Sequence, residues 1–233
     1  MRTAIFEAIR AARTDKSFDM NEVAAIDGLL DTLGVPRVAP VAPPQTPSGG
    51  PVTARVVLET VEHESIVQEA YKDSEGVWTW SVGLTAASGV DPIPYKDKPA
   101  QLSVCLAAAV ERMRNKYGPE VVKAFKGHAL TEAQFAAALS WHWNTGAIGR
   151  TDWVDLFLAG KVAEARTFMT THYLNGGDLK ERRLKEAALF FSGVWAQTGI
   201  ANVVPVAKPS YQPNFRLTKR VNIMADLALA LAA

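Results

Sequence analysis

Apolar side chains at helical spacing predict two short helices at the start of the chain. Residues 3–13 place an apolar stripe on one helical face, and the stretch after Asp19 repeats this spacing. Asp19, with Glu22 three residues later, is typical of a helix N-terminus in which side chain and backbone cap each other. The two stretches together predict a helical hairpin, which we assign as a separate module over residues 1–34.

Two proline-rich stretches interrupt the helical patterns. Residues 35–53 combine Pro with Ala, Ser and Gly, a composition that favours an extended tether. Residues 199–213 contain three further prolines and predict a second tether, followed by a final helix from about Phe215. These punctuations divide the chain into the hairpin, the first tether, a larger domain over 54–199, and a linker with a C-terminal helix over 200–233.

Between the tethers, the pattern changes from helix to strand and back to helix. Apolar spacing after residue 55 predicts a helix that ends near Glu64. Alternation over 78–82, with turn residues on both sides, predicts a small antiparallel sheet, and from residue 99 onward the spacing is helical. The larger domain is therefore predicted to be α+β and mainly α, with two lobes.

The composition narrows the function classes. The chain has 233 residues, of which 48% are hydrophobic, and a formal net charge of +1, so it carries no overall field that would attract nucleic acid. Neither a secretory signal nor an apolar run long enough to span a bilayer is visible. Cys105 is the one cysteine, and the four histidines lack metal-ligand spacing, so we expect an inert thiol and neither metal nor cofactor.

Three polar residues near the predicted sheet suggest chemistry. Glu64 falls at a helix end, Asp73 in a polar turn and Thr79 in a predicted strand, so the three could converge on one cleft. Paired carboxyl groups on either side of a glycosidic bond are the usual equipment of sugar hydrolases. Taken on spacing alone, the commoner interpretation is a helix-end Glu and a turn Asp without catalytic function.

The residues around these three carry a family resemblance. Glu64, eight residues, Asp73, five residues and Thr79, with Tyr71 and Gly76 between them, resemble the signature of phage lysozymes of glycoside hydrolase family 24, the T-even phage type. The resemblance implies that Glu64 is the general acid and that Asp73 and Thr79 hold the attacking water. It also implies a lysozyme-like fold with the cleft between its lobes.

The sequence departs from the family pattern directly after Thr79. Family members usually continue with aliphatic residues, two glycines and a histidine, whereas this chain has Ser81 at one glycine position and Leu84 at the histidine position. The catalytic trio is retained, but the strand geometry is open to change. Trp78 and Trp80 allow two interpretations, stacking on sugar rings or, more commonly, core packing.

Two later segments are also similar to the family. Trp143-Asn144-Thr145-Gly146 resembles a Phe-Asn-x-Gly helix ending, which implies that Asn144 contacts substrate, although Gly146 alone would explain a helix cap. The segment from Leu179 to Glu186 resembles Leu-x-x-Arg-Arg-x-x-Glu, which implies that Arg182 faces Glu64. Without the resemblance, the second segment would be interpreted as a charged helix face. We assign Tyr71, Asn144 and Arg182 to substrate binding.

The resemblance covers roughly residues 54–196 and predicts a peptidoglycan hydrolase. The expected reaction is hydrolysis of the β-1,4 bond between N-acetylmuramic acid and N-acetylglucosamine, with inversion and no covalent intermediate. Two alternatives remain open. A lytic transglycosylase would use Glu64 alone, and a catalytically silent wall-binding or virion protein would need none of the three residues.

The expected partner is bacterial peptidoglycan, and no nucleic acid is expected. The terminal helices have several interpretations, which are contact with the wall, with a membrane surface, with another copy of the chain or with a virion protein. The hairpin could also be a folding appendage, and the C-terminal helix could pack on the hairpin. A lysozyme made without an export signal would stay in the host cytoplasm until a holin releases it, or would travel in the virion.

Overall fold

The computed structural model divides the chain into two compact units, residues 1–42 and 43–233. It describes residues 5, 8–9, 12, 20–33 and 52–233. In the first unit, α2 (Met20–Thr32) lies where the sequence predicts the second helix of the hairpin. The predicted cap at Asp19 and most of the first tether lie outside the described residues.

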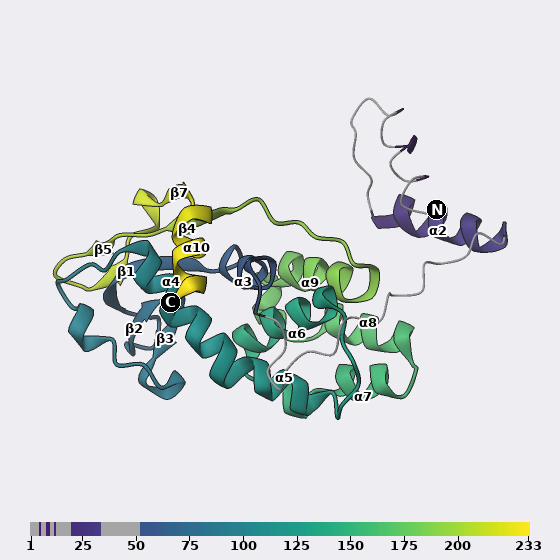
Figure 1. Cartoon of the computed structure of the whole chain (residues 1–233), viewed down its shortest axis with the longest axis horizontal. Helices are drawn as coiled ribbons and strands as arrows, with labels where there is room; N and C mark the ends of the chain where they lie inside the picture. The colour runs from purple at the N-terminus through teal and green to yellow at the C-terminus, as the bar shows by residue number, and fades with distance from the viewer. Residues whose placement is uncertain (1–4, 6–7, 10–11, 13–19, 34–51) are drawn as a thin grey trace. The chain divides into compact units, whose positions relative to one another are not determined.

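The second unit is mainly helical, with a small mixed sheet (Figure 1). Its α-helices are α3 (Ala54–Val61), α4 (Leu102–Arg112), α5 (Gly118–Ala124), α6 (Glu132–Thr145), α7 (Asp152–Leu158), α8 (Val162–Thr171), α9 (Lys180–Ser192) and α10 (Met224–Ala232). This arrangement confirms the predicted fold class.

The main sheet has five strands in the order β3-β2-β1-β4-β7. These are β1 (Ser65–Lys72), β2 (Trp78–Ser81), β3 (Leu84–Thr85), β4 (Ile200–Val203) and β7 (Lys219–Asn222). The first three form the antiparallel meander that the sequence predicts. The sheet is not wholly antiparallel, however, because β1 and β4 pair in parallel.

The prediction of a loose tether and a single helix after residue 199 is wrong. This segment contributes β4 and β7 to the main sheet, and β5 (Val206–Ala207) and β6 (Gln212–Pro213) form a second small sheet. Prolines are compatible with these strands because they stand at strand ends and in the turns. The family signature does not extend this far, so nothing in it indicated the pairing.

The C-terminal helix also differs from its prediction. It begins at Met224, since Phe215–Leu217 is a 3-10 turn and Lys219 and Arg220 lie in β7. Its apolar residues Leu227 and Ala230 are buried, and the helix packs on α4 (Figure 1). The apolar face is thus covered within the second unit, which corrects the expectation that the helix needs the hairpin as its partner.

Helix α6 lies at the centre of the helical lobe and packs against α3 and α9. Thr131 and Gln134 form the predicted capping box at its N-terminus, and Gly146 ends it in a left-handed conformation. Residues 136–141 are all completely or almost completely buried. Three of them are alanines, so neighbouring helices can approach this segment closely and surround it.

Helices α4 and α5 are joined by a single π-helical stretch, Met113–Tyr117, and Pro119 follows it in the first turn of α5. In the part of the chain that the structure describes, no helix is long and apolar enough to cross a membrane.

Candidate active site

Glu64 lies in the short segment that connects α3 to β1, the first strand of the sheet. Its backbone N–H donates to the carbonyl of Val61 at 3.2 Å, which closes a turn between the end of the helix and the strand. The side chain is 26% exposed, so the carboxyl group is accessible but its approach is restricted. Glu64 therefore lies three residues past the end of α3 and directly before β1, so the helix is shorter than the sequence pattern predicts.

Asp73 is fixed by the turn that joins β1 to β2. One carboxylate oxygen, Oδ1, accepts hydrogen bonds from the backbone N–H groups of Glu75 at 3.0 Å and Val77 at 2.9 Å. Gly76 takes φ +77°, which a side chain would disfavour, and completes the turn. The second oxygen, Oδ2, remains available to the site.

Thr79 lies beside Asp73 at the start of β2. Its hydroxyl oxygen is 3.4 Å from Oδ2 of Asp73 and 3.1 Å from the carbonyl of Val77, and the hydroxyl can donate to either acceptor. The residue is only 3% exposed, so strand packing holds its rotamer. The structure therefore brings together Asp73 and Thr79, the predicted water-holding pair.

Tyr71 connects the two carboxyl groups electrostatically. It pairs with Thr79 across the strands. Burial and then the negative charges of Glu64 and Asp73 raise the pKa of Tyr71 to about 12. Both carboxylates are thus within electrostatic reach of one phenol, which stays protonated and can donate a hydrogen bond at neutral pH.

Ser81 keeps the backbone conformation that glycine would favour. Its φ is +59°, in the left-handed region, although it carries a side chain. The buried hydroxyl donates to the carbonyl of Cys105 in α4 at 2.8 Å, which helps hold the strained backbone in place. Leu84, at the other departure from the family pattern, is 1% exposed and belongs to the core. Both residues lie in paired strands, Ser81 opposite Val67 and Leu84 opposite Trp80.

Arg182 approaches Glu64 from α9, as the resemblance implies. Its Nη1 donates to Oε1 of Glu64 at 2.5 Å, across 118 positions of sequence. The other carboxylate oxygen, Oε2, accepts no hydrogen bond from the described residues and is free for substrate. Burial lowers the pKa of Arg182, but the charges of Glu64 and Glu186 raise it by more, so the guanidinium stays charged.

Behind Arg182 lies a buried network that sequence reasoning did not resolve. Glu186 is 0% exposed and accepts from Nε of Arg182 at 3.0 Å, from the hydroxyl of Ser140 at 2.7 Å, and from Arg183. The available signal was the spacing of Arg182, Arg183 and Glu186 on one helix. Their burial excludes the interpretation of this segment as a solvated helix face.

Asn144 is exposed near the end of α6, and its side-chain oxygen accepts from Nη2 of Arg183. It therefore contacts the network through Arg183 rather than through Arg182. Gly146 has φ +61° and its N–H donates to the carbonyl of His142 at 2.7 Å, so the helix cap is present as well. The role of Asn144 in substrate binding stays a prediction.

The C-terminal segment fastens the loop that carries Glu64. The carboxylate of Glu62 accepts from the backbone N–H groups of Thr198 at 2.9 Å and Gly199 at 2.6 Å, and from the Thr198 hydroxyl at 3.0 Å. Sequence reasoning missed this contact. The β-branched residues of β4 were its only signal.

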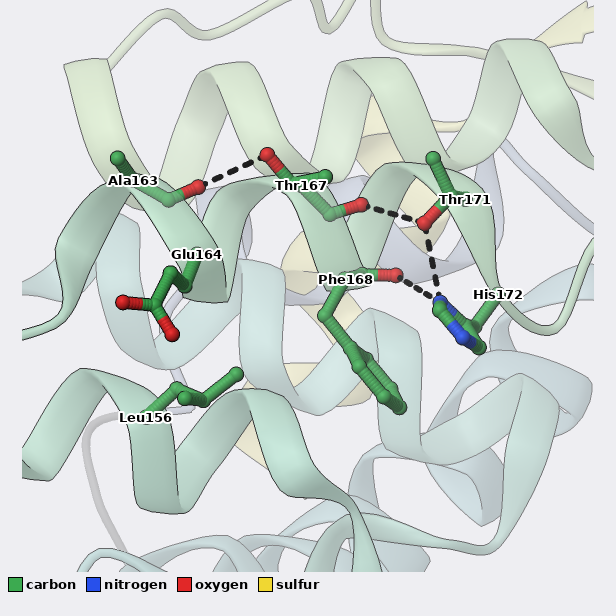
Figure 2. Close-up of a pocket in the computed structure, with 7 residues that line it drawn as sticks. All are labelled: Leu156, Ala163, Glu164, Thr167, Phe168, Thr171 and His172. Atoms are coloured by element: carbon green, nitrogen blue, oxygen red, sulfur yellow. Dashed lines mark hydrogen bonds between the residues drawn. The ribbon is translucent and has the colours of Figure 1, made fainter.

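Two surface pockets lie elsewhere in the helical lobe. One, of about 350 Å³, is lined by residues of α7, α8 and the following turn (Figure 2). The side-chain groups of Thr167, Thr171 and His172 hydrogen-bond within their own helix there, so few are left for a ligand. The other pocket, of about 500 Å³, lies between α5, the end of α6 and α7. Neither pocket contains a predicted site residue.

Among the described residues, no group of three or more His, Cys, Asp or Glu side chains could hold a metal ion. Cys105 is completely buried, and burial raises the pKa of its thiol to about 12, so the thiolate is not formed at neutral pH.

The fold, with the Glu64 carboxyl group and the Asp73–Thr79 pair both near Tyr71, is that of a lysozyme-like glycoside hydrolase. The chain matches the family described as phage lysozyme over residues 61–186, more than half of its length. It therefore belongs to the phage lysozyme family, and it is a peptidoglycan hydrolase of phage type. All the predicted site residues lie within the match.

Solved structures resemble about three fifths of the chain. A variant of P22 lysozyme is 19% identical with a TM-score of 0.50, and the alignment covers 60% of this chain and 98% of that one, which supports the fold. The muramidase domain of SpmX from Asticaccaulis excentricus is 24% identical, with a TM-score of 0.46 and coverage of 61% and 98%.

An endolysin from Escherichia coli O157:H7 phage FAHEc1 is 22% identical, with a TM-score of 0.40 and coverage of 64% and 99%. No curated protein sequence matches the chain significantly.

Proposed function

We propose that the protein hydrolyses the β-1,4 bond between N-acetylmuramic acid and N-acetylglucosamine in bacterial peptidoglycan. The observation that carries this proposal is the different environment of the two carboxyl groups. Glu64 is held through one oxygen by Arg182 and leaves the other free, whereas Asp73 is held by turn amides and keeps Oδ2 beside the hydroxyl of Thr79.

In the proposed mechanism, protonated Glu64 donates its proton from Oε2 to the glycosidic oxygen as the bond breaks. Asp73 and Thr79 orient a water molecule on the opposite face of the sugar ring, and Asp73 accepts a proton from that water as it attacks. The product then has inverted configuration at the anomeric carbon. Arg182 acts on the position of the acid and takes no part in proton transfer.

The buried network supports the acid in this proposal. Arg182 is fixed by hydrogen bonds to Glu186 and to the carbonyl of Ser140, the latter at 3.0 Å. Its guanidinium group therefore has little freedom to move relative to Glu64. A general acid whose rotamer is fixed in this way loses less orientational entropy on reaching the transition state.

The test is digestion of purified peptidoglycan by the wild type, Glu64→Gln, Asp73→Asn and Thr79→Ala, with mass spectrometry of the products. General-acid catalysis contributes about a hundred- to ten-thousand-fold, so Glu64→Gln should lose nearly all turnover. Circular dichroism of each variant serves as the folding control. Glu181→Gln, on the exposed face of α9, is the matched control for loss of a carboxylate near the site.

The outcomes separate the three functions. Hydrated reducing ends that depend on both Glu64 and Asp73 support the proposal. Anhydro ends that depend on Glu64 but not on Asp73 or Thr79 would identify a lytic transglycosylase. A wild type that binds the wall and releases no sugar ends would identify a non-catalytic wall protein. An initially retained product configuration, observed by NMR, would contradict the inverting mechanism.

We also propose that the enzyme serves phage-driven lysis or wall penetration, since its family is that of phage lysozymes. In the first role it acts from the host cytoplasm after release by a holin, and in the second it travels with the virion. Expression in a bacterial cytoplasm with and without a holin separates the roles, because only the first predicts lysis that depends on the holin.

A further inference from the structure

The hairpin of β1 and β2 has two faces, and the proposed mechanism uses only one of them. Tyr71 pairs with Thr79, and Lys72 pairs with Trp78. Because neighbouring residues of a strand point to opposite faces, Lys72 and Trp78 lie on the face away from Tyr71 and Thr79. This second face, close to the tip that carries Asp73, has no assigned role.

The second face carries aromatic rings surrounded by lysines. Trp78 and Tyr211 meet edge to face, with ring centres 5.3 Å apart and planes at 71°. The ammonium groups of Lys72 and Lys96 lie 5.5 and 5.6 Å from the Trp78 ring, and Lys96 and Lys208 lie 4.9 and 4.0 Å from Tyr211. We call these five residues the cation–aromatic surface.

The charges on this surface are unevenly compensated. Lys208 forms ion pairs with Glu69 and Asp97, each at 2.5 Å, and Tyr211 donates to Asp97 at 2.9 Å. Lys72 and Lys96 are exposed and have no carboxylate within ion-pair distance among the described residues. Two ammonium groups therefore remain open to an external anion beside a half-buried tryptophan.

The surface depends on the C-terminal segment. The backbone N–H of Lys72 donates to the carbonyl of Tyr211 at 2.7 Å, which attaches the turn between β5 and β6 to the end of β1. Tyr211 and Lys208 both lie outside the 61–186 match to the family. This chain thus adds residues of its own to the hairpin that carries Asp73 and Thr79.

We propose that the cation–aromatic surface binds carboxylate groups of peptidoglycan stem peptides, as a second wall contact on the face of the hairpin opposite the catalytic face. Ammonium groups attract carboxylates, and the exposed part of the Trp78 ring offers apolar contact to the peptide or sugar that carries them. Peptidoglycan is the expected ligand because it is the proposed substrate and its stem peptides carry free carboxylates, which complement the ammonium groups of Lys72 and Lys96, both unpaired among the described residues. The inference rests on the proposed function for its choice of ligand.

The test measures binding separately from hydrolysis. In a Glu64→Gln background, which leaves the wall intact, cosedimentation with purified peptidoglycan stripped of attached phosphate polymers gives the dissociation constant. Lys72→Gln with Lys96→Gln should raise this constant roughly tenfold at low salt, as expected for losing two exposed charge contacts. The effect should shrink as salt is added.

A matched control removes the same charge from another surface. Lys123→Gln with Lys161→Gln, on the helical lobe, should leave binding unchanged. Amidation of the wall carboxylates with carbodiimide and ammonia should weaken wild-type binding and abolish the difference between wild type and the Lys72, Lys96 variant. A difference that persists on the amidated wall would overturn the proposal, as would equal binding by both double variants.

The experiments distinguish stem-peptide carboxylates from phosphate polymers as the source of the anion. They also distinguish failure of the binding proposal from failure of the catalytic proposal. If the lysines matter only on walls that retain phosphate polymers, the stem peptide is not the ligand and the inference fails. If lysine-dependent binding is found but the wild type releases no sugar ends, the catalytic proposal fails and the surface stands. If sugar ends are released but the lysines make no difference to binding, the cation–aromatic surface proposal fails and the catalytic proposal stands.

Discussion

The two sides of the active site hold their carboxyl groups by different means. On the helical side, Glu186 is completely buried and bonded to two arginines and a serine. On the hairpin side, Asp73 is held at the surface by the backbone amides of its own turn. Glu64 lies between these extremes, since it is 26% exposed and held through one oxygen.

The difference indicates a division of work. A buried carboxylate with every position occupied is a structural anchor, because exchanging its partners would leave a charge in an apolar interior. A carboxylate with a free oxygen can exchange a proton with substrate. Burial is therefore a better guide than charge to which of the glutamates near Arg182 reacts, and this comparison can be tested from both sides.

The largest effect on stability is expected at the anchor. Glu186→Gln leaves Arg182 and Arg183 buried without their shared carboxylate, and breaking a buried pair in this way costs about 3–5 kcal/mol of unfolding free energy. Urea denaturation followed by circular dichroism measures the change. Glu181→Gln removes a carboxylate from the exposed face of the same helix and should have no measurable effect. Equal effects of the two substitutions on stability would contradict the role of buried Glu186 as a structural anchor.

A smaller effect is expected on the hairpin side, at Ser81. Ser81→Ala loses the buried hydrogen bond to Cys105 but keeps the left-handed backbone, so it should destabilise the fold by about 1 kcal/mol. Ser81→Gly loses the same bond but relieves roughly 1 kcal/mol of backbone strain, so its stability should stay near that of the wild type. Thermal denaturation of both variants gives the order. An alanine variant more stable than the glycine variant would show that φ +59° carries no strain here.

The smallest expected effect is on the pH dependence of the free energy of unfolding, through His142 near the end of α6. Burial lowers the pKa of His142, although Glu120 at 2.6 Å opposes this. Below the ordinary histidine pKa of about 6.5, the unfolded chain therefore binds a proton that the folded protein takes up only at lower pH, so the free energy of unfolding falls as pH falls.

In the variant His142→Asn, the loss of stability between pH 7 and pH 5 should be shallower than in the wild type. Urea denaturation at several pH values measures both slopes. His172→Asn, at an exposed histidine, is the matched control and should keep the wild-type slope. A wild-type slope in the His142 variant would show that its titration is not coupled to folding.

The sequence was informative wherever local pattern and function coincide. The helix before Glu64, the turn at Asp73, the strand at Thr79 and the capping box of Thr131 depend on residues close together in the chain. The contact between Arg182 and Glu64 spans 118 positions and was reached only through the family resemblance. Spacing alone left Arg182 on a solvated helix face.

The C-terminal segment shows where local pattern fails. Prolines in residues 199–213 suggested a tether, but β4 is a strand because β1 offers its free edge, with Ser65 opposite Asn202. A two- to four-residue strand has little signal of its own, and its conformation is selected by the partner that completes its hydrogen bonds. The attachment of the C-terminal segment to β1 also places Tyr211 beside Trp78.

The sequence by itself determined the fold class, the family and the identity of the three candidate catalytic residues, because these are written in periodicity, turn chemistry and a spaced signature. Only the tertiary structure decided which charges are buried, that Ser81 keeps a glycine-like backbone, and that the C-terminal segment completes the sheet. Burial, long-range pairing and backbone strain are properties of residues distant in sequence, and no local pattern contains them.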